Sequence, residues 1–541
     1  MYPGKWAAQT PDKPAVIMAD TGAQLSYAQL EERSLCLANH FRAAGLGVGD
    51  HVAVIAENRF EIIEAYWAAQ RSGVLITVVN RHLTPSEVSY IVHDCDAAIV
   101  LVSRTLEHAN ALIEACADVP EIIVIGGSSA PDRGVGADGV DGGGAERPLL
   151  DYEAVLAAAS PERPDYEARG DDMLYSSGTT GRPKGILPAP LDQPVEDPNV
   201  AIVQLFTKLL GFNRDTVYLS PAPLYHAAPI RFVMTTHAQG GTAVIMPRFD
   251  EREALTVIER YRVTHSQWVP TMFVRMLKLP EEVRRAADTS SLRVAVHAAA
   301  PCPVEVKRAM IEWWGPVIWE YYAATEANGV TAISSEDALA HPGSVGRDGL
   351  KGIAHICGPD GEELPPGEVG VIYFENDKAF EYYKDADKTA GTRHPDHPTW
   401  TAIGDLGWMD EDRFLYLADR QRFLIISGGV NIYPQEIENE LALLPALSDV
   451  AVVGEPDEEL GQIVVAYAMA ADPSSADDAD PQAAAEALAA DVVAHLRDRL
   501  ARFKIPRVLC VVDELPRTPT GKLVKRNLDP ARVRARVPLR A

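Results

Sequence analysis

Residues Tyr175 to Gly185 read YSSGTTGRPKG. Three glycines, four serine and threonine residues (Ser176, Ser177, Thr179, Thr180) and one lysine, Lys184, lie within this short stretch. Backbone N–H groups and hydroxyls at this density can surround phosphate oxygens while the lysine supplies positive charge. A Walker loop requires Gly-Lys followed by Ser or Thr, whereas Lys184 here lies between Pro183 and Gly185. A plain surface turn would explain the glycines but not the ordered string, so the stretch predicts a phosphate-binding loop.

Around this loop, the chain has the size and composition of a multidomain globular protein. It has 541 residues, 47 % hydrophobic and 23 % charged, enough for two to four folding units. The formal net charge of −27 disfavours nucleic acid and anionic membrane surfaces as main partners, while a small anionic ligand remains compatible.

The cysteines and the hydropathy pattern predict where the protein works. Its six cysteines show no CxxC pairing, which is typical of free thiols in a reducing compartment. No apolar run is long enough for a membrane helix, and the N-terminal residues lack the apolar stretch of a signal peptide. We therefore expect a cytoplasmic protein without a membrane span.

Upstream of the loop, helical and strand patterns alternate. Ser26 with Gln29 and Thr84 with Pro85 and Glu87 mark helix starts, and residues 61–71 form a further amphipathic stretch. Apolar strands are expected at 52–55, 74–79, 97–102 and 122–125. Strands without polar alternation, separated by helices, predict an α/β fold whose largely parallel sheet is covered on both faces.

Three stretches resemble surface excursions: 126–148, 187–200 and 471–480. The prolines of the second stretch exclude a regular helix there. From about Gln421, strands at 450–453, 463–467 and 508–512 combine with a helix expected over 485–503. This mixture predicts a small α+β unit at the C-terminus.

The loop and several later motifs, in the same order, resemble the adenylate-forming superfamily, which includes acyl-CoA synthetases, luciferases and peptide-synthetase adenylation domains. The resemblance runs from about Pro11 to about Asn527. The motifs are PAPLYHAAP at 221–229, VPT at 269–271, HAAAP at 297–301, YYAATE at 321–326, GDLG at 404–407, DRQR at 419–422, SGGVNIYP at 427–434 and PRTPTGK at 516–522. Each string alone is weak, and their joint order makes the resemblance specific.

This resemblance implies a role for individual residues. Lys522, Glu326 and His226 are the implied catalytic residues. The implied ATP and AMP contacts are Ser176, Ser177, Gly178, Thr179, Thr180, Gly181, Lys184, Ala298, Ala300, Pro301, Tyr322, Ala323, Thr325, Asp405 and Arg420. Glu326, together with Thr180, is the implied magnesium ligand. Tyr225, His226 and Ala299 would line the acyl pocket, Gly428 and Gly429 the channel for the CoA arm, and Arg422 would be the hinge.

The same resemblance implies an N-terminal adenylation domain over 1–420 and a mobile C-terminal domain over 421–541. ATP, Mg²⁺ and CoA are the implied cofactors. A carboxylate must approach the α-phosphorus of a polyanion, so the barrier is largely electrostatic, and a lysine on a movable domain suits this task. The C-terminal domain would then turn and present its double-glycine loop for thiol attack.

Four departures from the family pattern concern the details. Ala323 replaces a glycine, Ile403 replaces a hydroxyl residue, Arg422 replaces an Asp or Lys, and a proline-rich stretch follows Gly185. None of them changes Lys522, Glu326, Asp405 or Arg420, so adenylation is less affected than thioester formation.

The substrate is expected to be a carboxylic acid other than a free amino acid, because Tyr225 and His226 stand where amino-acid-activating relatives carry an aspartate. The alanines at 298–300 favour a bulky hydrophobic acid over a short one, although alanine is abundant throughout the chain. Acid–CoA ligase is the leading interpretation. The alternatives are an acyl-AMP ligase that serves a carrier protein, a luciferase-like oxidase and a non-catalytic ATP-binding homologue, and a homodimer is also left open.

Overall fold

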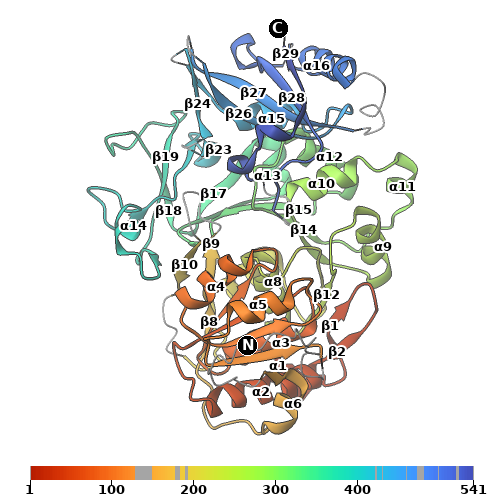
Figure 1. Cartoon of the computed structure of the whole chain (residues 1–541), viewed down its shortest axis with the longest axis vertical. Coiled ribbons are helices and arrows are strands. Elements are labelled where there is room, and N and C mark those ends of the chain that lie inside the picture. Colours follow the sequence, from red (N-terminus) through yellow and green to blue (C-terminus); the bar gives the residue numbers. More distant parts are fainter. Residues whose placement is uncertain are drawn as a thin grey trace, which may run out of the picture. The chain divides into compact units, whose positions relative to one another are not determined.

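The structure, a computed structural model, describes residues 2–127, 149–176, 183–188, 193–420, 423–428, 430–457, 460–471, 481–497, 499–518 and 523–539. Two compact units make up the chain. Unit 1 consists of Met1–Phe249, Arg260–Gln267 and Phe380–Ala390, and unit 2 of Asp250–Glu259, Trp268–Ala379 and Gly391–Ala541. Both contain helices and strands, which confirms the predicted α/β class (Figure 1). Within the described ranges, no helix combines the length and the apolar character needed to cross a bilayer.

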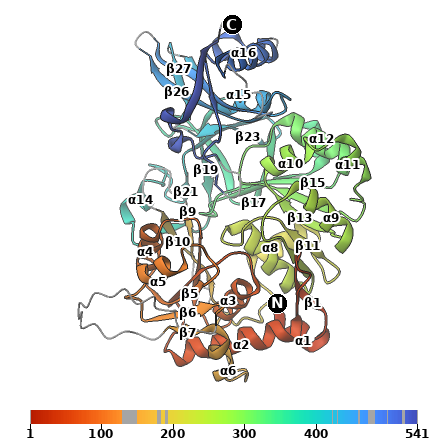
Figure 2. The same cartoon turned by 45° about the vertical axis from the view of Figure 1, so that its right-hand side comes forward.

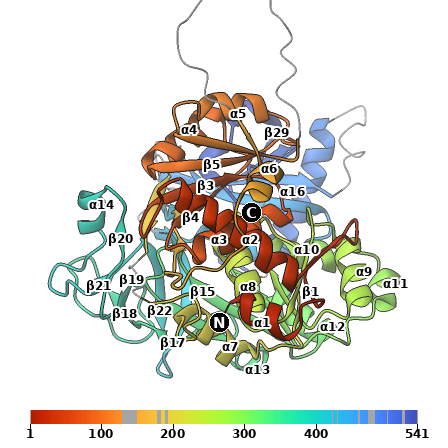
Figure 3. The same cartoon turned by 90° about the horizontal axis from the view of Figure 1, so that it is seen from below.

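The predicted parallel sheet lies in unit 1. Its strand order is β7–β6–β5–β3–β4–β8, with every neighbouring pair parallel. The strands are β3 His51–Ile55, β4 Leu75–Val79, β5 Ala97–Ser103, β6 Glu121–Ile125, β7 Leu150–Asp151 and β8 Asp171–Asp172. Helices α4 (Pro85–Asp94) and α5 (Ala109–Ala115) cover one face, and α2 (Tyr27–Ala43) and α3 (Phe60–Gln70) lie on the other (Figure 3).

Local sequence signals place the helix starts of this sheet. Ser26 caps α2 and Thr84 caps α4, each in a reciprocal capping box with the residue three positions later. Leu30, Leu37 and Phe41 of α2 are fully buried, as their common face predicts. The observed helix and strand starts in this sheet therefore agree with the predicted starts to within about a residue.

Unit 1 contains two further strand groups. One has the order β13–β11–β12–β1–β2, and the other is the antiparallel group β20–β10–β9. Their bounds are β1 Pro14–Met18, β2 Gln24–Ser26, β9 Leu174–Ser176, β10 Lys184–Leu187, β11 Val217–Ser220, β12 Thr242–Ile245, β13 His265–Trp268 and β20 Glu381–Tyr382. The helices are α1 Pro3–Gln9, α6 Tyr152–Ala158, α7 Ala201–Leu210 and α8 Ala227–Ala238. Within the described residues of 187–200, the backbone forms no helix, as the prolines predict.

Unit 2 carries strands in the order β18–β19–β22–β23–β17–β16–β15–β14, with β21 on β19. They are β14 Val294–His297, β15 Ile318–Ala323, β16 Val330–Ile333, β17 Ser344–Lys351, β18 Ile353–Cys357, β19 Gly370–Glu375, β21 Trp400–Thr401, β22 Asp405–Met409 and β23 Phe414–Arg420. The accompanying helices are α9 Glu251–Tyr261, α10 Pro270–Leu277, α11 Glu281–Ala286, α12 Val304–Trp314 and α13 Ser335–Ala340, while α14 Ala386–Ala390 belongs to unit 1.

The C-terminal part of unit 2 is an α+β arrangement, as predicted. Its sheet has the order β25–β24–β27–β28–β29, with β26 paired to β27. The elements are β24 Ile425–Ser427, β25 Val430–Ile432, α15 Pro434–Leu441, β26 Leu447–Asp457, β27 Gly461–Ala470, α16 Pro481–Arg497, β28 Val508–Val512 and β29 Val533–Pro538, with short 3₁₀ turns at Arg502–Lys504, Lys525–Asn527 and Pro530–Arg532. Apolar faces of α15 and α16 pack on this sheet (Figure 2).

The helix predicted over 485–503 was wrong at its end, because α16 runs from Pro481 to Arg497. The residue before a proline avoids the helical region, and Ile505, which precedes Pro506, is extended at φ −64° and ψ 128°. The helix ends at Arg497, and a separate 3₁₀ turn, Arg502–Lys504, precedes Ile505. Most of the excursions predicted at 126–148 and 471–480 lie outside the described residues.

Candidate active site

The strands that flank the glycine-rich loop form an antiparallel pair in unit 1. Ser176 at the end of β9 stands opposite Lys184 at the start of β10, and Tyr175 stands opposite Gly185. Lys184 Nζ lies 4.7 Å from the centroid of the Tyr382 ring on β20. Ser177, Gly178, Thr179, Thr180 and Gly181, as well as the side chain of Ser176, lie outside the described residues. The strands thus bring the two ends of the predicted phosphate loop together and place its lysine at one end.

Tyr175 and Gly185 pack the base of this strand pair. The Tyr175 hydroxyl donates a hydrogen bond of 2.6 Å to Asp94 Oδ2 on α4, and burial raises the pKa of Tyr175. A Cβ on Gly185 would lie 2.9 Å from Met173 Cε and 3.1 Å from Tyr175 Cζ. Gly185 therefore packs closely beneath the loop, where a larger residue would displace the Met173 and Tyr175 side chains.

The predicted acyl-side residues lie between β11 and α8 in unit 1. Tyr225 is buried, and its ring centroid is 4.5 Å from that of His226, which is the N-cap residue of α8. Burial raises the pKa of Tyr225. These aromatic side chains follow the carboxyl end of a parallel strand, where ligands commonly bind in α/β proteins.

Asn58 holds this segment in place and was not predicted from the sequence. Its Oδ1 accepts a 2.9 Å hydrogen bond from the Leu224 N–H, and its Nδ2 donates to the carbonyls of Ala222 at 3.1 Å and Met246 at 2.8 Å. The side chain is almost completely buried. The sequence signal that could have identified Asn58 was its position just after the apolar strand predicted at 52–55.

In unit 2, the HAAAP segment leaves the end of β14. Ala298 is buried, and its N–H donates to the Trp268 carbonyl at 3.3 Å. Ala299 is exposed and adopts a φ of +76°, which is unusual for a residue other than glycine. Ala300 and Pro301 follow, both half-buried. The alanine run therefore forms a tight turn, and a small side chain suits the turn whether or not it also widens an acyl pocket.

The YYAATE segment leaves the parallel neighbour of β14, strand β15. Tyr322 and Ala323 complete the strand, and Thr325 and Glu326 lie in the following turn. The turn is fastened at its far end, where Asn328 Nδ2 donates to the Thr401 carbonyl at 3.2 Å. A Cβ on Gly329 would lie 2.1 Å from the Phe374 ring, so only glycine fits there. The candidate magnesium ligand Glu326 thus lies in a loop held by long-range contacts.

Tyr322 reaches the candidate ribose contact Asp405. The Tyr322 hydroxyl donates a 2.8 Å hydrogen bond to Asp405 Oδ2. Asp405 is buried at the start of β22 and stands opposite Arg420 of β23 in the antiparallel register. Backbone register thereby places Arg420 beside Asp405, while the Arg420 side chain lies outside the described residues. The arrangement combines an aromatic ring with a fixed carboxylate, groups suited to an adenine and a ribose.

The remaining predicted residues belong to the C-terminal region. Gly428 lies in the β24–β25 turn at φ +56°, and its N–H donates to the Leu460 carbonyl at 2.9 Å. Arg422, Gly429 and Lys522 lie outside the described residues.

A magnesium site made by protein side chains alone is not found in the described ranges, because they contain no group of three His, Cys, Asp or Glu residues close enough to hold a metal. Mg²⁺ is commonly held by one or two carboxylates together with nucleotide phosphates. A single carboxylate at Glu326 therefore fits a magnesium ion that arrives with ATP.

Comparisons with known proteins agree with these motifs. The family model described as AMP-binding enzyme matches residues 4–384, and the model described as AMP-binding enzyme C-terminal domain matches residues 436–522. A feruloyl-CoA synthase from Amycolatopsis sp is 31 % identical over 97 % of this chain and 97 % of its own length. A long-chain-fatty-acid–CoA ligase from Mycobacterium tuberculosis is 30 % identical over 96 % and 95 %, respectively.

Among solved structures, o-succinylbenzoate CoA synthetase from Bacillus subtilis, in complex with an acyl-adenylate intermediate, superposes with a TM-score of 0.77. It is 25 % identical in sequence and matches over 98 % of both chains. The family models together span most of the chain, and the relatives match it almost from end to end. This chain therefore belongs to the AMP-binding enzyme family, within the adenylate-forming superfamily that its motifs predicted.

Proposed function

We propose that this chain is an AMP-forming acid–CoA ligase. In the first step, a carboxylate oxygen attacks the α-phosphorus of ATP, the bond from that phosphorus to the bridging oxygen breaks, and pyrophosphate leaves. In the second step, the thiolate of CoA attacks the acyl carbon, the bond to the AMP oxygen breaks, and acyl-CoA and AMP are released. The relatives named as CoA ligases and the match to both family domains support this reaction.

The residues of unit 2 are proposed to bind the nucleoside. Tyr322 would face the adenine and Asp405 would accept hydrogen bonds from the ribose hydroxyls, with Arg420 as a second contact. The observation that carries this proposal is the 2.8 Å hydrogen bond by which Tyr322 orients the buried Asp405 carboxylate. A carboxylate held in this way needs no reorientation when a ribose arrives. Ala298, Ala300, Pro301, Ala323 and Thr325 would complete the contacts.

The phosphates and the acid are proposed to meet other residues. Lys184 and the loop from Ser176 to Gly181 would bind the leaving pyrophosphate, and Lys522 would bridge the carboxylate and the α-phosphate. Mg²⁺ held by Glu326, with Thr180 as a further ligand, would neutralise phosphate charge. His226 and Tyr225, with Ala299, would border the acyl group. These assignments follow the motif positions.

The acid is proposed to be bulky and hydrophobic. Two relatives are named for feruloyl-CoA and for long-chain fatty acids, which supports a large apolar substrate, whereas a third is named for the small acid sulfoacetate. The proposed division into domains 1–420 and 421–541, with Arg422 as hinge and Gly428 and Gly429 at the CoA channel, allows the C-terminal domain to serve both steps. A homodimer and a cytoplasmic location are further parts of the proposal, and a carrier protein is the alternative acceptor.

A panel of carboxylic acids tests the function. Pyrophosphate release is measured for each acid with ATP and Mg²⁺, with and without CoA, and the thioester product is identified. Thioester formation with free CoA is expected for at least one bulky acid. Adenylation without a thioester would favour a carrier-protein acceptor, and no activation of any acid would contradict the proposal.

The role of Lys522 is tested by Lys522→Ala. The variant should lose acid-dependent ATP–pyrophosphate exchange by about a thousandfold or more, because the transition-state charge is left without its cation. Its melting temperature should stay close to that of the wild type. Exchange at the wild-type rate would disprove the assigned role.

A further inference from the structure

A buried ion pair lies behind the strands that carry the nucleotide-side residues. Lys307 on α12 pairs with Glu320 on β15, and their side chains are only 7 % and 4 % exposed. Removing two charges from water is costly, and well-packed apolar residues are often as stable or more so. A pair buried to this extent is therefore poorly explained by stability alone.

Lys307 also links strands that are not neighbours. Its ammonium donates a second hydrogen bond, 3.3 Å long, to the Ser344 carbonyl at the start of β17. Strand β16 lies between β15 and β17. The Ser344 hydroxyl in turn donates to the Leu415 carbonyl of β23 at 2.9 Å. One lysine thus ties β15 to β17, and Ser344 continues the connection to β23.

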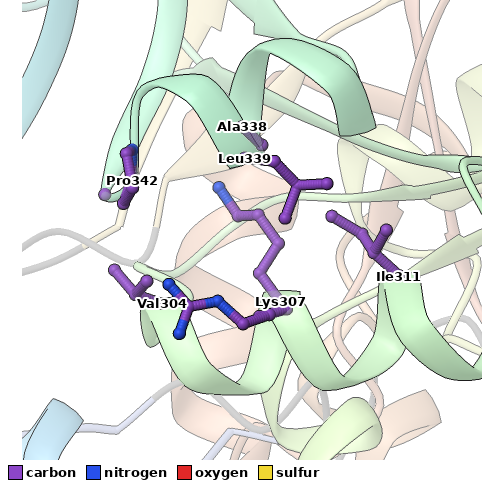
Figure 4. A pocket seen from close by; sticks show the side chains of 8 residues that line it. Val304, Lys307, Ile311, Ala338, Leu339 and Pro342 are labelled. Atoms are coloured by element: carbon purple, nitrogen blue, oxygen red, sulfur yellow. The ribbon is translucent and has the colours of Figure 1, made fainter.

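The surroundings of Lys307 are mostly apolar. Figure 4 shows its side chain extending from α12 among residues that line a small pocket. The pocket is lined by Val304, Lys307, Arg308, Ile311, Ala338, Leu339, Pro342 and Gly343. The apolar members restrict water around the ammonium, and in such surroundings hydrogen bonds to charged groups are strong and directional.

The candidate site begins next to this pair. Glu320 precedes Tyr322 by two residues, so both side chains project from the same face of β15. Glu320 is also in register with His297, the last residue of β14, and His297 directly precedes Ala298. Tyr322 therefore lies two residues beyond the partner of Lys307 on β15, and Ala298 directly follows the residue of β14 that is in register with that partner.

His297 does not pair with the Glu320 carboxylate, so Lys307 is the cation that does. The His297 ring is fully buried, and within the described ranges neither ring nitrogen has a hydrogen-bond partner. Its Nδ1 lies 3.9 Å from Glu320 Oε1, beyond hydrogen-bond distance. Burial and the nearby Lys307 charge hold the pKa of His297 well below 6.5, so the imidazole is neutral.

We infer that Lys307 and Glu320 are positioning residues for ATP binding. They hold β15 against β17 and β23, and the register between β15 and β14 extends this effect to β14. Tyr322 and the 298–301 turn are thereby presented to the nucleotide. The inference rests on the proposed function. Neither residue is assigned a contact with substrate. Their effect is exerted through the strands that precede Tyr322 and Ala298.

The test compares one single variant, one double variant and a matched control. Lys307→Met removes the cation, and Lys307→Met/Glu320→Met removes both charges while retaining volume. Arg308→Met is the control, because Arg308 is the next residue of α12 and lines the same pocket. Among the described residues, its one ion pair is an exposed pair with Glu305. ATP affinity is measured by calorimetry without acid, and KM and kcat are measured by pyrophosphate exchange.

Lys307→Met should weaken ATP binding and raise the KM for ATP by about tenfold, because small displacements of binding groups are costly, with kcat per folded enzyme changed much less. Its melting temperature should also be lower than that of the wild type, because Glu320 is left unpaired. The double variant should melt near the wild-type temperature but keep the raised KM, since methionine cannot hydrogen-bond to Ser344. The control should match the wild type in every measurement.

A double variant with wild-type ATP affinity and KM would overturn the inference, because it would make the pair a purely structural feature. If Lys307→Met does not fold, the double variant alone decides. A wild type that binds ATP but activates no acid would count against the proposed function instead, and the ATP affinities of the variants would still test the positioning pair.

Discussion

Tyr322 and Asp405 lie on strands that are four steps apart in the sheet, yet they are joined by a 2.8 Å hydrogen bond. The order between them is β15–β16–β17–β23–β22. In a flat sheet, four steps would separate the strands by about 19 Å, farther than a tyrosine and an aspartate can bridge. This part of unit 2 must therefore curve strongly. The curvature brings an aromatic ring and a carboxylate from distant parts of the sequence to one place.

The first prediction concerns this hydrogen bond. Tyr322→Phe should raise the KM for ATP by about tenfold, because a hydrogen bond to a charged acceptor contributes about 1.5–3 kcal/mol and orients Asp405. Steady-state pyrophosphate exchange at varied ATP measures the effect. Tyr416→Phe is the matched control, since it removes a 3.1 Å tyrosine–aspartate hydrogen bond, to Asp410, near the other end of β23. Equal KM values for the two variants would contradict the assignment.

The second prediction concerns the loop that carries Glu326. Gly329→Ala should destabilise the protein by about 2 kcal/mol or more and lower the exchange rate, because the new methyl group overlaps the Phe374 ring. Gly329→Ala/Phe374→Leu should regain part of the exchange rate, since the smaller side chain makes room. Gly47→Ala, at a position with no atom within 4 Å of the added Cβ, is the control. A single variant as stable and active as this control would rule out the packing argument.

The third prediction concerns pH. His237 is fully buried, with Trp67 Nε1 donating to its Nδ1 at 3.2 Å and its Nε2–H donating to the Ala15 carbonyl at 3.0 Å. Burial lowers the pKa of His237 from 6.5 to about 4. Between these values, the unfolded chain binds a proton that the folded protein excludes, so the free energy of unfolding decreases as the pH falls, by about 3 kcal/mol in total.

Melting temperatures at pH 7.5, 6.5, 5.5 and 4.5 check this prediction. His237→Gln retains a donor and an acceptor but does not titrate. It should be less stable than the wild type at pH 7.5, and the difference should shrink as the pH is lowered. A difference that stays constant over this range would show that His237 does not contribute to the pH dependence.

The fourth prediction concerns the thiols. All six cysteines are free and buried, which confirms the expectation of free thiols, and burial raises the pKa of Cys95 to about 12 and that of Cys116 to about 11. Thiolates are the reactive form. A thiol reagent at pH 8 should therefore react very slowly with the native protein. In guanidinium, the unfolded protein should consume six equivalents of the reagent. Rapid reaction of the native protein would reveal a thiol that opens to solvent.

Local patterns were sufficient to predict much of the fold. The capping boxes at Ser26 and Thr84 and the apolar strand runs are each contained in a few consecutive residues, and the structure confirms the helices and strands they predict. The ordered motifs predicted the family, and the family domains confirm it. The end of the helix predicted over 485–503 was wrong, because α16 ends at Arg497 and Arg502–Lys504 form a separate 3₁₀ turn.

What the sequence by itself determined was which segments form helices and strands, because backbone preference and hydrophobic period are local properties. Only the tertiary structure decided that Asn58 holds the segment before Tyr225, that Phe374 requires a glycine at 329, and that Lys307 joins β15 to β17. These contacts depend on strand order and on sheet curvature. Strand order and sheet curvature produce no periodic pattern in the sequence, because residues that are in contact are neighbours in space and can be far apart along the chain.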